Sequence, residues 1–485
     1  MESGNLTGQN GRMTSVQKRI LAVVIIGTLM SAVDVTIVLL AIPQITAALH
    51  TNLATSIWVI IAYLLVVAIL TTQLGRIGDI FGRGRMFNVG FLVFTASSLL
   101  CGLSFSIYML IFFRIMQGIG GAFIQANSGA IIADTFERDN RGKAFGYTSL
   151  GWNIGSMLGI VLGGVLVTFA GWPYIFYINV PIGIFAAYFG FKYIRSAERK
   201  KEYLDIPGMA VLGTSLLMIT LGGISIASFG VAFFDIAMLA IGAVLLLLFI
   251  FVEKRSSFPT INLDVFKKKI LARSILAAFF QSLGYLAIAF IIIMYLQGVR
   301  GLSPFAAALI LIPGYILSGL LAPRMGRLSD RIGARLLSTT GLAIMLLAVL
   351  FYLNLTATSS YYYIIFITVI SGIGSAMFYP ANSSAVMANA EGKDYGSTAG
   401  LLRTMSNIGT LGSFIITVSV ASLSVSRNVA FDIFVGTSDL TGKISAAFVT
   451  GMHAVFVISA IILIIAAILS ALRGKEDRAS TDIKV

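Results

Sequence analysis

Two residues of opposite charge, Asp34 and Arg114, lie inside long apolar segments of the chain. If these segments cross a membrane, each charge costs at least about 2.5–3.5 kcal/mol, so it is retained where it is paired or functional. Both residues lie about two turns from the end of their segments, which places them roughly 10–12 Å below the same membrane surface. We therefore expect Asp34 and Arg114 to share a depth and to face one cavity.

The chemistry available to this pair is proton transfer. A carboxylate that binds a proton from one side of a membrane and releases it to the other side is the device of a proton-coupled carrier. In this interpretation Asp34 carries the proton and Arg114 adjusts its affinity, and a cationic substrate that competes with the proton at Asp34 is exchanged for it. The other interpretation is a purely structural ion pair.

The composition places these segments in a membrane. Of the 485 residues, 58% are hydrophobic and 11% are charged, whereas soluble proteins carry about 25% charged residues. Cys101 is the single cysteine, and the two histidines, His50 and His453, are far apart, so we expect no disulfide and no metal site. The chain contains no phosphate-binding Gly-x-x-x-x-Gly-Lys-Ser/Thr pattern and no Ser/His/Asp or paired-carboxylate constellation within its apolar segments. We expect no enzyme activity and no cofactor, with a proton gradient as the energy source.

Fourteen apolar runs are long enough to cross a membrane, for which a helix needs about 20 residues. They are 19–41, 56–74, 86–104, 107–131, 144–169, 173–194, 208–228, 232–252, 272–297, 304–325, 336–354, 360–386, 397–423 and 447–472. Loops on the side of the two termini hold nearly all the lysines and arginines, and the opposite loops hold only Arg300, Arg427 and Lys443. The positive-inside rule then predicts cytoplasmic termini in a multi-pass protein of the cell membrane. The net charge of +14 is explained by topology and anionic lipid, and we expect no nucleic acid partner.

A charged loop motif occurs twice in the chain. Its first copy contains Gly75, Asp79, Gly82, Arg83 and Arg85, and its second copy contains Gly326, Asp330 and Arg335. The two copies are 251 residues apart, and the same offset relates the first apolar run to the ninth, which indicates two parallel copies of a membrane half. We expect the charged groups to bridge neighbouring helix ends and to hold the cytoplasmic side closed in the outward-facing state. The alternative is that they only set the topology.

The repeat divides the chain into parts. We expect a cytoplasmic N-terminal segment 1–18, a six-helix half 19–194, a linker 195–271 that contains two extra transmembrane helices, a second six-helix half 272–472 and a cytoplasmic C-terminal segment 473–485. The sequence suggests no role for the two inserted spans or for the outer loop 424–446.

Four glycines of the fifth run, Gly151, Gly155, Gly159 and Gly163, recur every four residues and therefore lie on one helix face. Such a groove lets another helix approach closely. The functional interpretation is a hinge or sliding surface for alternating access, and the alternative is ordinary close packing.

Polar and aromatic side chains within the runs are candidates for the wall of a substrate cavity. They are Tyr63, Gln125, Gln281, Tyr285 and Asn382. Each of them could equally pack in a helix interface. Tyr285 occupies the position related to Asp34 by the repeat, so we expect the ionisable chemistry to be concentrated in the first half.

Taken together, the motifs resemble the major facilitator superfamily, and in particular its fourteen-span drug:proton antiporter branch. The similar segments span nearly the whole chain and are Asp34–Val38 with Ala41–Pro43, Trp58 with Tyr63 and Leu64, Gly75–Arg85, Arg114–Gly118, Trp172 with Phe176, Asn179, Pro181 and Gly183, and Tyr295–Gln297 with Gly301, Ser303, Pro304 and Pro313. The resemblance implies an all-α polytopic membrane protein with the major facilitator fold, in which two pseudo-symmetric six-helix halves and two inserted helices make fourteen transmembrane helices. It also implies that Arg114 takes part in proton coupling.

Four positions depart from the expected pattern, and two of them are Pro173, where an arginine is usual, and Gly84, where a basic residue is common. Ile160 follows Gly159 where the branch has a proline, and Arg403 stands where its thirteenth span has a small or amide residue. We expect Arg403 to extend to the aqueous interface from the cytoplasmic end of its helix.

These observations predict a proton-coupled secondary active transporter that exports amphipathic or cationic drugs by alternating access. The expected partners are membrane lipid, protons and a small-molecule substrate, and we expect a monomer. Two alternatives stay open. One is an exporter or importer of a specific metabolite, such as a peptide, siderophore, sugar or lipid, and the other is a non-transporting membrane receptor or scaffold.

Overall fold

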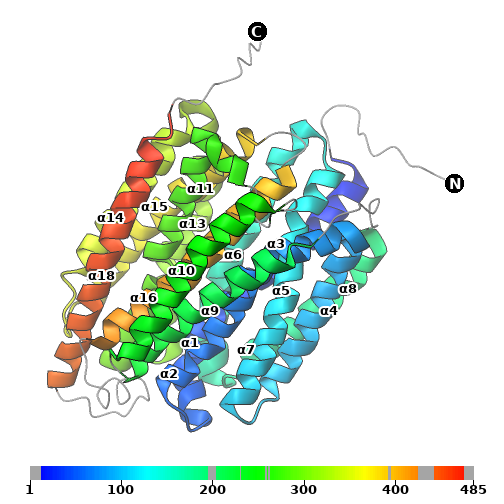
Figure 1. Cartoon of the computed structure of the whole chain (residues 1–485). Helices are drawn as coiled ribbons and strands as arrows, with labels where there is room; N and C mark the ends of the chain where they lie inside the picture. The colour runs from blue at the N-terminus through cyan, green and yellow to red at the C-terminus, as the bar shows by residue number, and fades with distance from the viewer. Residues whose placement is uncertain are drawn as a thin grey trace.

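The structure, a computed structural model, describes residues 13–194, 204–229, 231–256, 259, 263–390, 395–423 and 442–474. Within these ranges the chain is a bundle of long α-helices (Figure 1), and fourteen of its helical segments are long and apolar enough to span a membrane. The predicted all-α fold with fourteen spans is confirmed. The expected segments 1–18 and 473–485, the linker residues 195–203 and the outer loop 424–446 lie largely or wholly outside the described residues.

The first six spans are built from eight helical segments. They are α1 (Ser15–Ala48), α2 (Leu53–Ser56), α3 (Trp58–Phe81), α4 (Arg83–Gly102), α5 (Ile107–Thr135), α6 (Arg138–Phe169), α7 (Tyr174–Tyr177) and α8 (Asn179–Tyr193). Local sequence explains where several begin. The Thr14 hydroxyl accepts a hydrogen bond from the Gln17 backbone N–H while the Gln17 side chain accepts one from Thr14, a capping box that starts α1. Ser106 caps α5 in the same way through Met109 N–H.

The last six spans follow the same order. Their segments are η1 (Leu263–Lys267), α11 (Lys269–Tyr285), α12 (Ile288–Met294), the π-helical turn η2 (Tyr295–Val299), α13 (Pro304–Ile332), α14 (Ala334–Tyr352), α15 (Tyr361–Ala388), α16 (Tyr395–Leu423) and α18 (Gly442–Ala471). The ninth span is interrupted between α11 and α12, where Ala287 N–H donates to Ser413 Oγ of α16 at 3.1 Å. That bond satisfies a backbone donor at membrane depth. The bundle side on which α1 begins and α18 ends is called the terminal side below (Figure 1).

The sequence repeat corresponds to a repeated backbone. Gly82 ends α3 and starts α4 with φ 103°, and Gly333, 251 residues later, ends α13 and starts α14 with φ 100°. Both turns need a glycine, because residues with a side chain rarely adopt this conformation. The following helices also pack alike. A Cβ on Gly90 would lie 3.0 Å from the carbonyl oxygen of Gly120, and one on Gly341 would lie 2.8 Å from that of Gly374.

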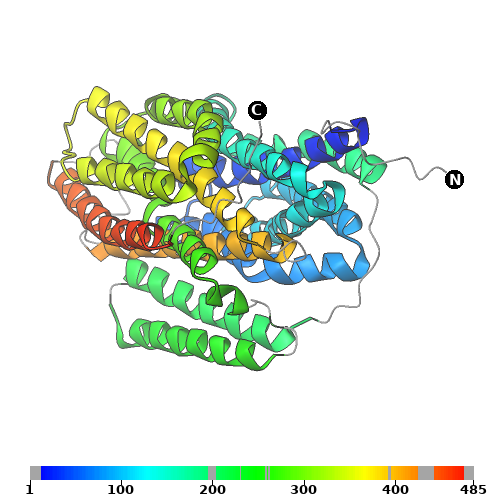
Figure 2. The ribbon, with the colours of Figure 1, turned by 90° about the horizontal axis from the view of Figure 1, so that it is seen from above.

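The inserted helices α9 (Ile206–Phe229) and α10 (Phe233–Arg255) lie side by side at the edge of the bundle (Figure 2). α9 packs on α3 of the first half and on α16 of the second half, so the pair lies against a seam between the halves. α10 exposes apolar side chains such as Val244 (62%) and Leu247 (68%). These residues fit a lipid-facing surface.

The glycines of α6 bring that helix into backbone contact with α1. A Cβ on Gly155 would lie 2.6 Å from the carbonyl oxygen of Leu29, and one on Gly163 would lie 3.0 Å from that of Ile37. Gly151 and Gly159 face the same helix, at Ile25 and Val33. The four glycines therefore form a close α1–α6 interface within the first half, and a hinge or sliding role for them stays a prediction.

Adding one methyl group to this interface is expected to destabilise the protein. Gly155→Ala places a Cβ against the Leu29 carbonyl, whereas Gly146→Ala on the same helix meets no atom within 4 Å. Because alanine favours a helix over glycine by about 0.8–1 kcal/mol, we expect Gly155→Ala to lower the thermal unfolding midpoint of the purified protein and Gly146→Ala to leave it unchanged or raise it. Equal midpoints for both variants would contradict the packing described here.

Candidate functional site

Asp34 of α1 and Arg114 of α5 form a buried ion pair. Arg114 Nη1 lies 2.7 Å from Asp34 Oδ2, and the two side chains are 1% and 0% exposed. The structure thus brings together the two intramembrane charges that the sequence singled out. A pair of this kind is neutral as a unit, which lowers the cost of placing either charge in a membrane.

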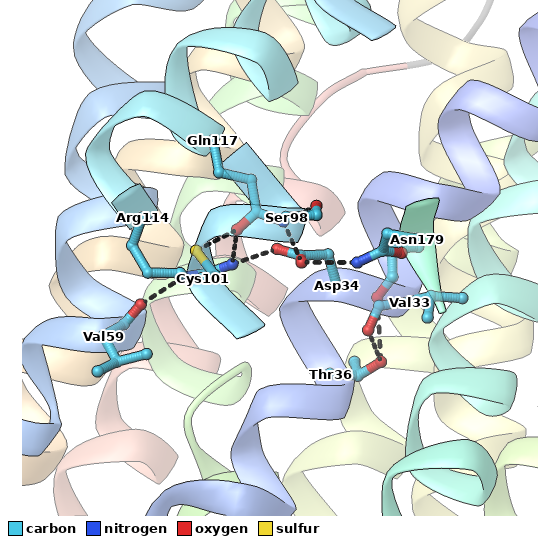
Figure 3. A network of polar contacts seen from close by, with 10 residues as sticks. Val33, Asp34, Thr36, Val59, Ser98, Cys101, Arg114, Gln117 and Asn179 are labelled. Atoms are coloured by element: carbon cyan, nitrogen blue, oxygen red, sulfur yellow. Dashed lines mark hydrogen bonds and ion pairs between the residues drawn. The ribbon is translucent and has the colours of Figure 1, made fainter. Parts of the chain in front are cut away.

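The carboxylate of Asp34 is held by amide side chains as well. Its Oδ1 accepts hydrogen bonds from Gln117 Nε2 of α5 at 2.8 Å and from Asn179 Nδ2 of α8 at 3.3 Å, as Figure 3 shows. Gln117 Nε2 also donates to Ser98 Oγ of α4 at 2.7 Å. These donors favour the ionised carboxylate and fix its orientation.

The Arg114 guanidinium also has several partners besides Asp34. Its Nε donates to the Val59 carbonyl of α3 at 2.7 Å, and its Nη1 donates to Gln117 Oε1 at 2.6 Å. The guanidinium carbon lies 4.4 Å from the ring centre of Tyr63 and 5.7 Å from that of Phe176 of α7, within the range of cation–π attraction. Residues of α1, α3, α4, α5, α7 and α8 therefore meet at this cluster.

The sequence did not predict the partners of this pair. Gln117 lies three residues after Arg114 and thus on the same face of α5, a spacing that could have suggested it. Asn179 and Ser98 lie on other helices. Asn179 belongs to a segment that resembles the family, and only its polarity within an apolar run marks Ser98. No spacing in the sequence relates them to Asp34.

A central cavity of about 340 Å³ lies beside the cluster, at the lower end of the roughly 300–1,000 Å³ of ligand pockets. All five residues expected on a cavity wall are among its lining: Tyr63, Gln125, Gln281, Tyr285 and Asn382. Both halves contribute to the wall. Asn407 of α16 donates to Gln125 Oε1 of α5 at 3.3 Å, and Gln281 donates to the Tyr379 hydroxyl at 3.0 Å.

Asp34 and Arg114 do not line this cavity. The residues that α1 contributes to the wall are Ala32, Val35, Thr36 and Leu39, and the Asp34 side chain is fully buried on another face. The expectation that both charges face one cavity is therefore corrected. Tyr63 separates the two compartments, because it lines the cavity and its ring covers Arg114.

The cavity extends toward the terminal side. Its wall includes Ile132 and Met387, which lie within one turn of the terminal-side ends of α5 and α15. Toward the opposite side, the wall formed by α1 and α13 stops at Leu39 and Leu311. These residues lie about two turns from Ala48, where α1 ends, and from Pro304, where α13 begins.

Contacts between the halves close the opposite side. Phe305 N–H of α13 donates to Thr168 Oγ1 of α6 at 3.1 Å, and the rings of Phe169 and Phe305 lie 5.7 Å apart. Gln297 Nε2 donates to the Leu40 carbonyl at 3.4 Å. The structure therefore represents a conformation in which the cavity faces the terminal side.

The first copy of the loop motif joins three helix ends. Arg83, at the start of α4, donates to Asp79 of α3 and, at 2.7 Å, to Asp134 of α5. All three residues belong to the first half, and no ion pair within the described residues joins the two halves. The expected bridge between neighbouring helix ends is present, and its closing function stays a prediction. Arg85 is exposed.

The second copy of the motif keeps the backbone and loses this ion pair. Gly75 packs near Ala126 and Gly326 packs near Pro380, with similar distances of 3.7 and 3.6 Å from a Cβ built on each glycine. Ala334 occupies the position related to Arg83, and Arg335 is exposed. The Asp330 side chain lies outside the described part of the structure.

Arg403 of α16 lies on the wall of the cavity. Its guanidinium carbon lies 4.9 Å from the ring centre of Trp152 of α6. The expectation that Arg403 extends to the aqueous interface at the end of its helix is therefore wrong. The aromatic face of Trp152, on the other half, holds the guanidinium within the cavity.

Comparison with known proteins agrees with this architecture. The profile of the Major Facilitator Superfamily matches residues 24–414. The riboflavin transporter RibZ of Clostridioides difficile (strain 630) is 31% identical over 391 residues, which are 80% of this chain and 85% of that protein. The tetracenomycin C resistance and export protein of Streptomyces glaucescens is 29% identical over 413 residues, 83% of this chain and 76% of that protein. Among solved structures, a bacterial homolog of the human lysosomal transporter Spinster, inward-facing and unoccupied, matches with a TM-score of 0.67 at 17% identity, covering 95% of this chain and 98% of that one.

Removing one member of the ion pair is expected to cost more stability than removing both. Arg114→Gln leaves the Asp34 carboxylate buried without a compensating charge, a loss on the order of 3–5 kcal/mol for pairs of this kind. The double variant Asp34→Asn, Arg114→Gln removes both charges. We expect the single variant to have the lower unfolding midpoint in detergent, and a double variant no more stable than the single one would contradict the pairing.

The direction in which the cavity opens can be measured by cysteine labelling. Cys101 is fully buried, so the unmodified protein provides an unreactive background. Ser383 lines the cavity near the terminal-side end of α15. We expect Ser383→Cys to react with a membrane-impermeant maleimide in vesicles that expose the terminal side and not in vesicles of the opposite orientation. Thr358→Cys, on an exposed loop of the other side, should show the reverse pattern, and labelling of Ser383→Cys only from that other side would refute the assignment.

Proposed function

The chain belongs to the Major Facilitator Superfamily and is therefore a multi-pass membrane transporter and not an enzyme; from this premise we propose that it is a proton-coupled exporter of amphipathic small molecules. Export proceeds by alternating access, in which the two halves open the cavity to one side of the membrane at a time. This proposal places the chain in the drug:proton antiporter branch of the superfamily.

One observation carries the proposal: a chain of contacts leads from Asp34 to the cavity. Asp34 pairs with Arg114, Arg114 lies under the ring of Tyr63, and Tyr63 lines the wall. A change in the charge of Asp34 can therefore reach the wall without any contact between the carboxylate and the substrate.

Proton binding changes this chain of contacts in a definite way. A protonated Asp34 no longer neutralises Arg114, which would leave a guanidinium charge inside a low-dielectric site. The Val59 carbonyl and Gln117 Oε1 still accept from Arg114, but neither carries a compensating charge. Rearrangement of Arg114 with its Tyr63 cover relieves this cost, and in the proposal it biases the equilibrium between the two cavity states.

The direction of transport rests on charge distribution and on similarity. The terminal-side loops are rich in lysine and arginine, so we assign the terminal side to the cytoplasm of a cell-membrane protein. The cavity then loads from the cytoplasm. A similar protein is named for resistance and export, which supports outward transport. In this proposal the protein acts as a monomer, and the α1–α6 glycine face and the Arg83 bridge keep the first half rigid while the halves move.

The substrate is proposed to be amphipathic because the wall mixes aromatic and amide side chains with apolar ones. The expectation of a cationic substrate finds no support in the described lining, which contains no aspartate or glutamate. A second candidate function is transport of one specific metabolite. A riboflavin transporter is similar to this chain over most of both lengths, and the amides of Gln125, Gln281 and Asn407 could bind a polar heterocycle.

Proton movement in vesicles tests the coupling. Protein in vesicles with an imposed pH gradient would receive fluorescein, N-phenyl-1-naphthylamine or ethidium, which are an anionic, a neutral and a cationic amphipath. We expect at least one of them to induce proton flux in the wild type and this flux to fall by about tenfold or more in Asp34→Asn at matched expression. The control is Asp235→Asn, because Asp235 caps α10 outside the two halves. Equal coupled flux in wild type and Asp34→Asn would remove Asp34 from the mechanism.

A further inference from the structure

The central cavity carries a net positive charge. Among its described lining residues, Arg403 is the one charged side chain. The other polar groups of the wall are amides, hydroxyls and the phenols of Tyr63, Tyr285, Tyr315, Tyr352 and Tyr379. The electrostatic potential inside this pocket therefore favours an anion and opposes a cation.

Arg403 also has no anionic partner among the residues that the structure describes. It makes no hydrogen bond or ion pair with any residue that the structure describes. Its guanidinium makes a cation–π contact with the Trp152 ring, whose centre lies 4.9 Å from the guanidinium carbon. Its neighbours on α16 are engaged elsewhere, because Thr404 bonds to Thr72 at 2.8 Å and Asn407 bonds to Gln125 at 3.3 Å. The N–H groups of its guanidinium are therefore free to bind a group within the cavity.

The two arginines that are almost completely buried provide a contrast. Arg114 has the Asp34 carboxylate, and Arg473, just after α18, donates to Ser338 Oγ, Ser470 Oγ and Asn382 Oδ1 at 2.6 to 3.1 Å. Where this fold buries a guanidinium structurally, it supplies acceptors for it. Among the described residues, Arg403 has no such acceptor, and it lies at the wall of the cavity.

We propose that Arg403, held by Trp152, is the subsite for an anionic group of the substrate, so that the transported compounds are amphipathic organic anions. A carboxylate, sulfonate or phosphate can accept two parallel hydrogen bonds from a guanidinium. The aromatic or apolar body of the compound then lies against the tyrosines that α11, α13, α14 and α15 contribute to the wall. The inference rests on the proposed transport function and specifies its substrate class.

The pair also joins the two halves of the protein. Trp152 belongs to α6 of the first half and Arg403 to α16 of the second. A bound anion neutralises Arg403 at this junction. The substrate therefore acts on a contact between the parts that must move, while Asp34 acts within the first half.

Equilibrium binding without a pH gradient tests the subsite independently of proton coupling. The probes are fluorescein, an anion at neutral pH, and rhodamine 6G, a cation on the same xanthene ring system, and binding is followed by fluorescence anisotropy with purified protein in nanodiscs. We expect the wild type to bind fluorescein more tightly than rhodamine 6G. Arg403→Gln should weaken fluorescein binding by about 10- to 100-fold, and Arg403→Lys should weaken it less, because lysine keeps the charge and loses the two-bond geometry.

The reversed-charge variant is the sharpest comparison. Arg403→Glu should invert the preference, so that rhodamine 6G binds more tightly than fluorescein. Arg324→Gln serves as the matched control, because Arg324 is exposed on α13 and does not line the cavity. Every variant is first checked for an unchanged elution volume and unfolding midpoint.

Three results would overturn the proposal. They are equal fluorescein affinity in wild type and folded Arg403→Gln, a wild-type preference for rhodamine 6G, and no binding of fluorescein by folded wild type. Proton flux in the wild type separates this outcome from failure of the proposed function. Fluorescein binding that depends on Arg403, without any substrate-induced proton flux in the wild type, would refute the proposed coupling and leave the anion subsite standing.

Discussion

The pairing of Asp34 with Arg114 constrains the whole first half of the molecule. Two charges buried in a membrane must compensate each other and satisfy their remaining hydrogen-bonding groups. Here the groups that do so come from α3, α4, α5 and α8, through the Val59 carbonyl, Ser98, Gln117 and Asn179. A shift of any of these segments changes the surroundings of the pair. The same cluster that braces the half is the place at which the proposed proton would act.

Much of the architecture could be predicted from the sequence. The fourteen spans follow from the lengths of apolar runs, and the 251-residue offset anticipated the matching turns at Gly82 and Gly333. The rotation of each helix about its axis could not be predicted, because lipid-facing and packed faces of a membrane helix are both apolar. For this reason the depth of Asp34 in the membrane indicated Arg114 as its partner. It did not indicate that Tyr63 separates this pair from the cavity. Because the rotation of α16 could not be predicted, Arg403 was expected at the aqueous interface, whereas it lies over Trp152.

The two halves have similar backbone arrangements and differ in their polar side chains. Tyr285 stands where the repeat relates it to Asp34, and Ala334 stands where it relates to Arg83. The first half therefore contains the enclosed ion pair and the braced helix ends, and the second half contributes most of the aromatic wall and Arg403. Helix packing through Gly90 and Gly341 is retained in both, which indicates that the fold tolerates this redistribution because it depends on close backbone contacts more than on particular polar groups.

The inserted helices make the two flanks of the transporter unequal. α9 lies on the α3–α16 seam with α10 outside it, whereas the seam between α6 and α13 has no such cover among the described helices. A compound dissolved in the bilayer and diffusing in its plane thus meets two layers of helix on one flank and one on the other. Any lateral exchange between the surrounding lipid and the cavity would therefore have the shorter path on the flank formed by α6 and α13.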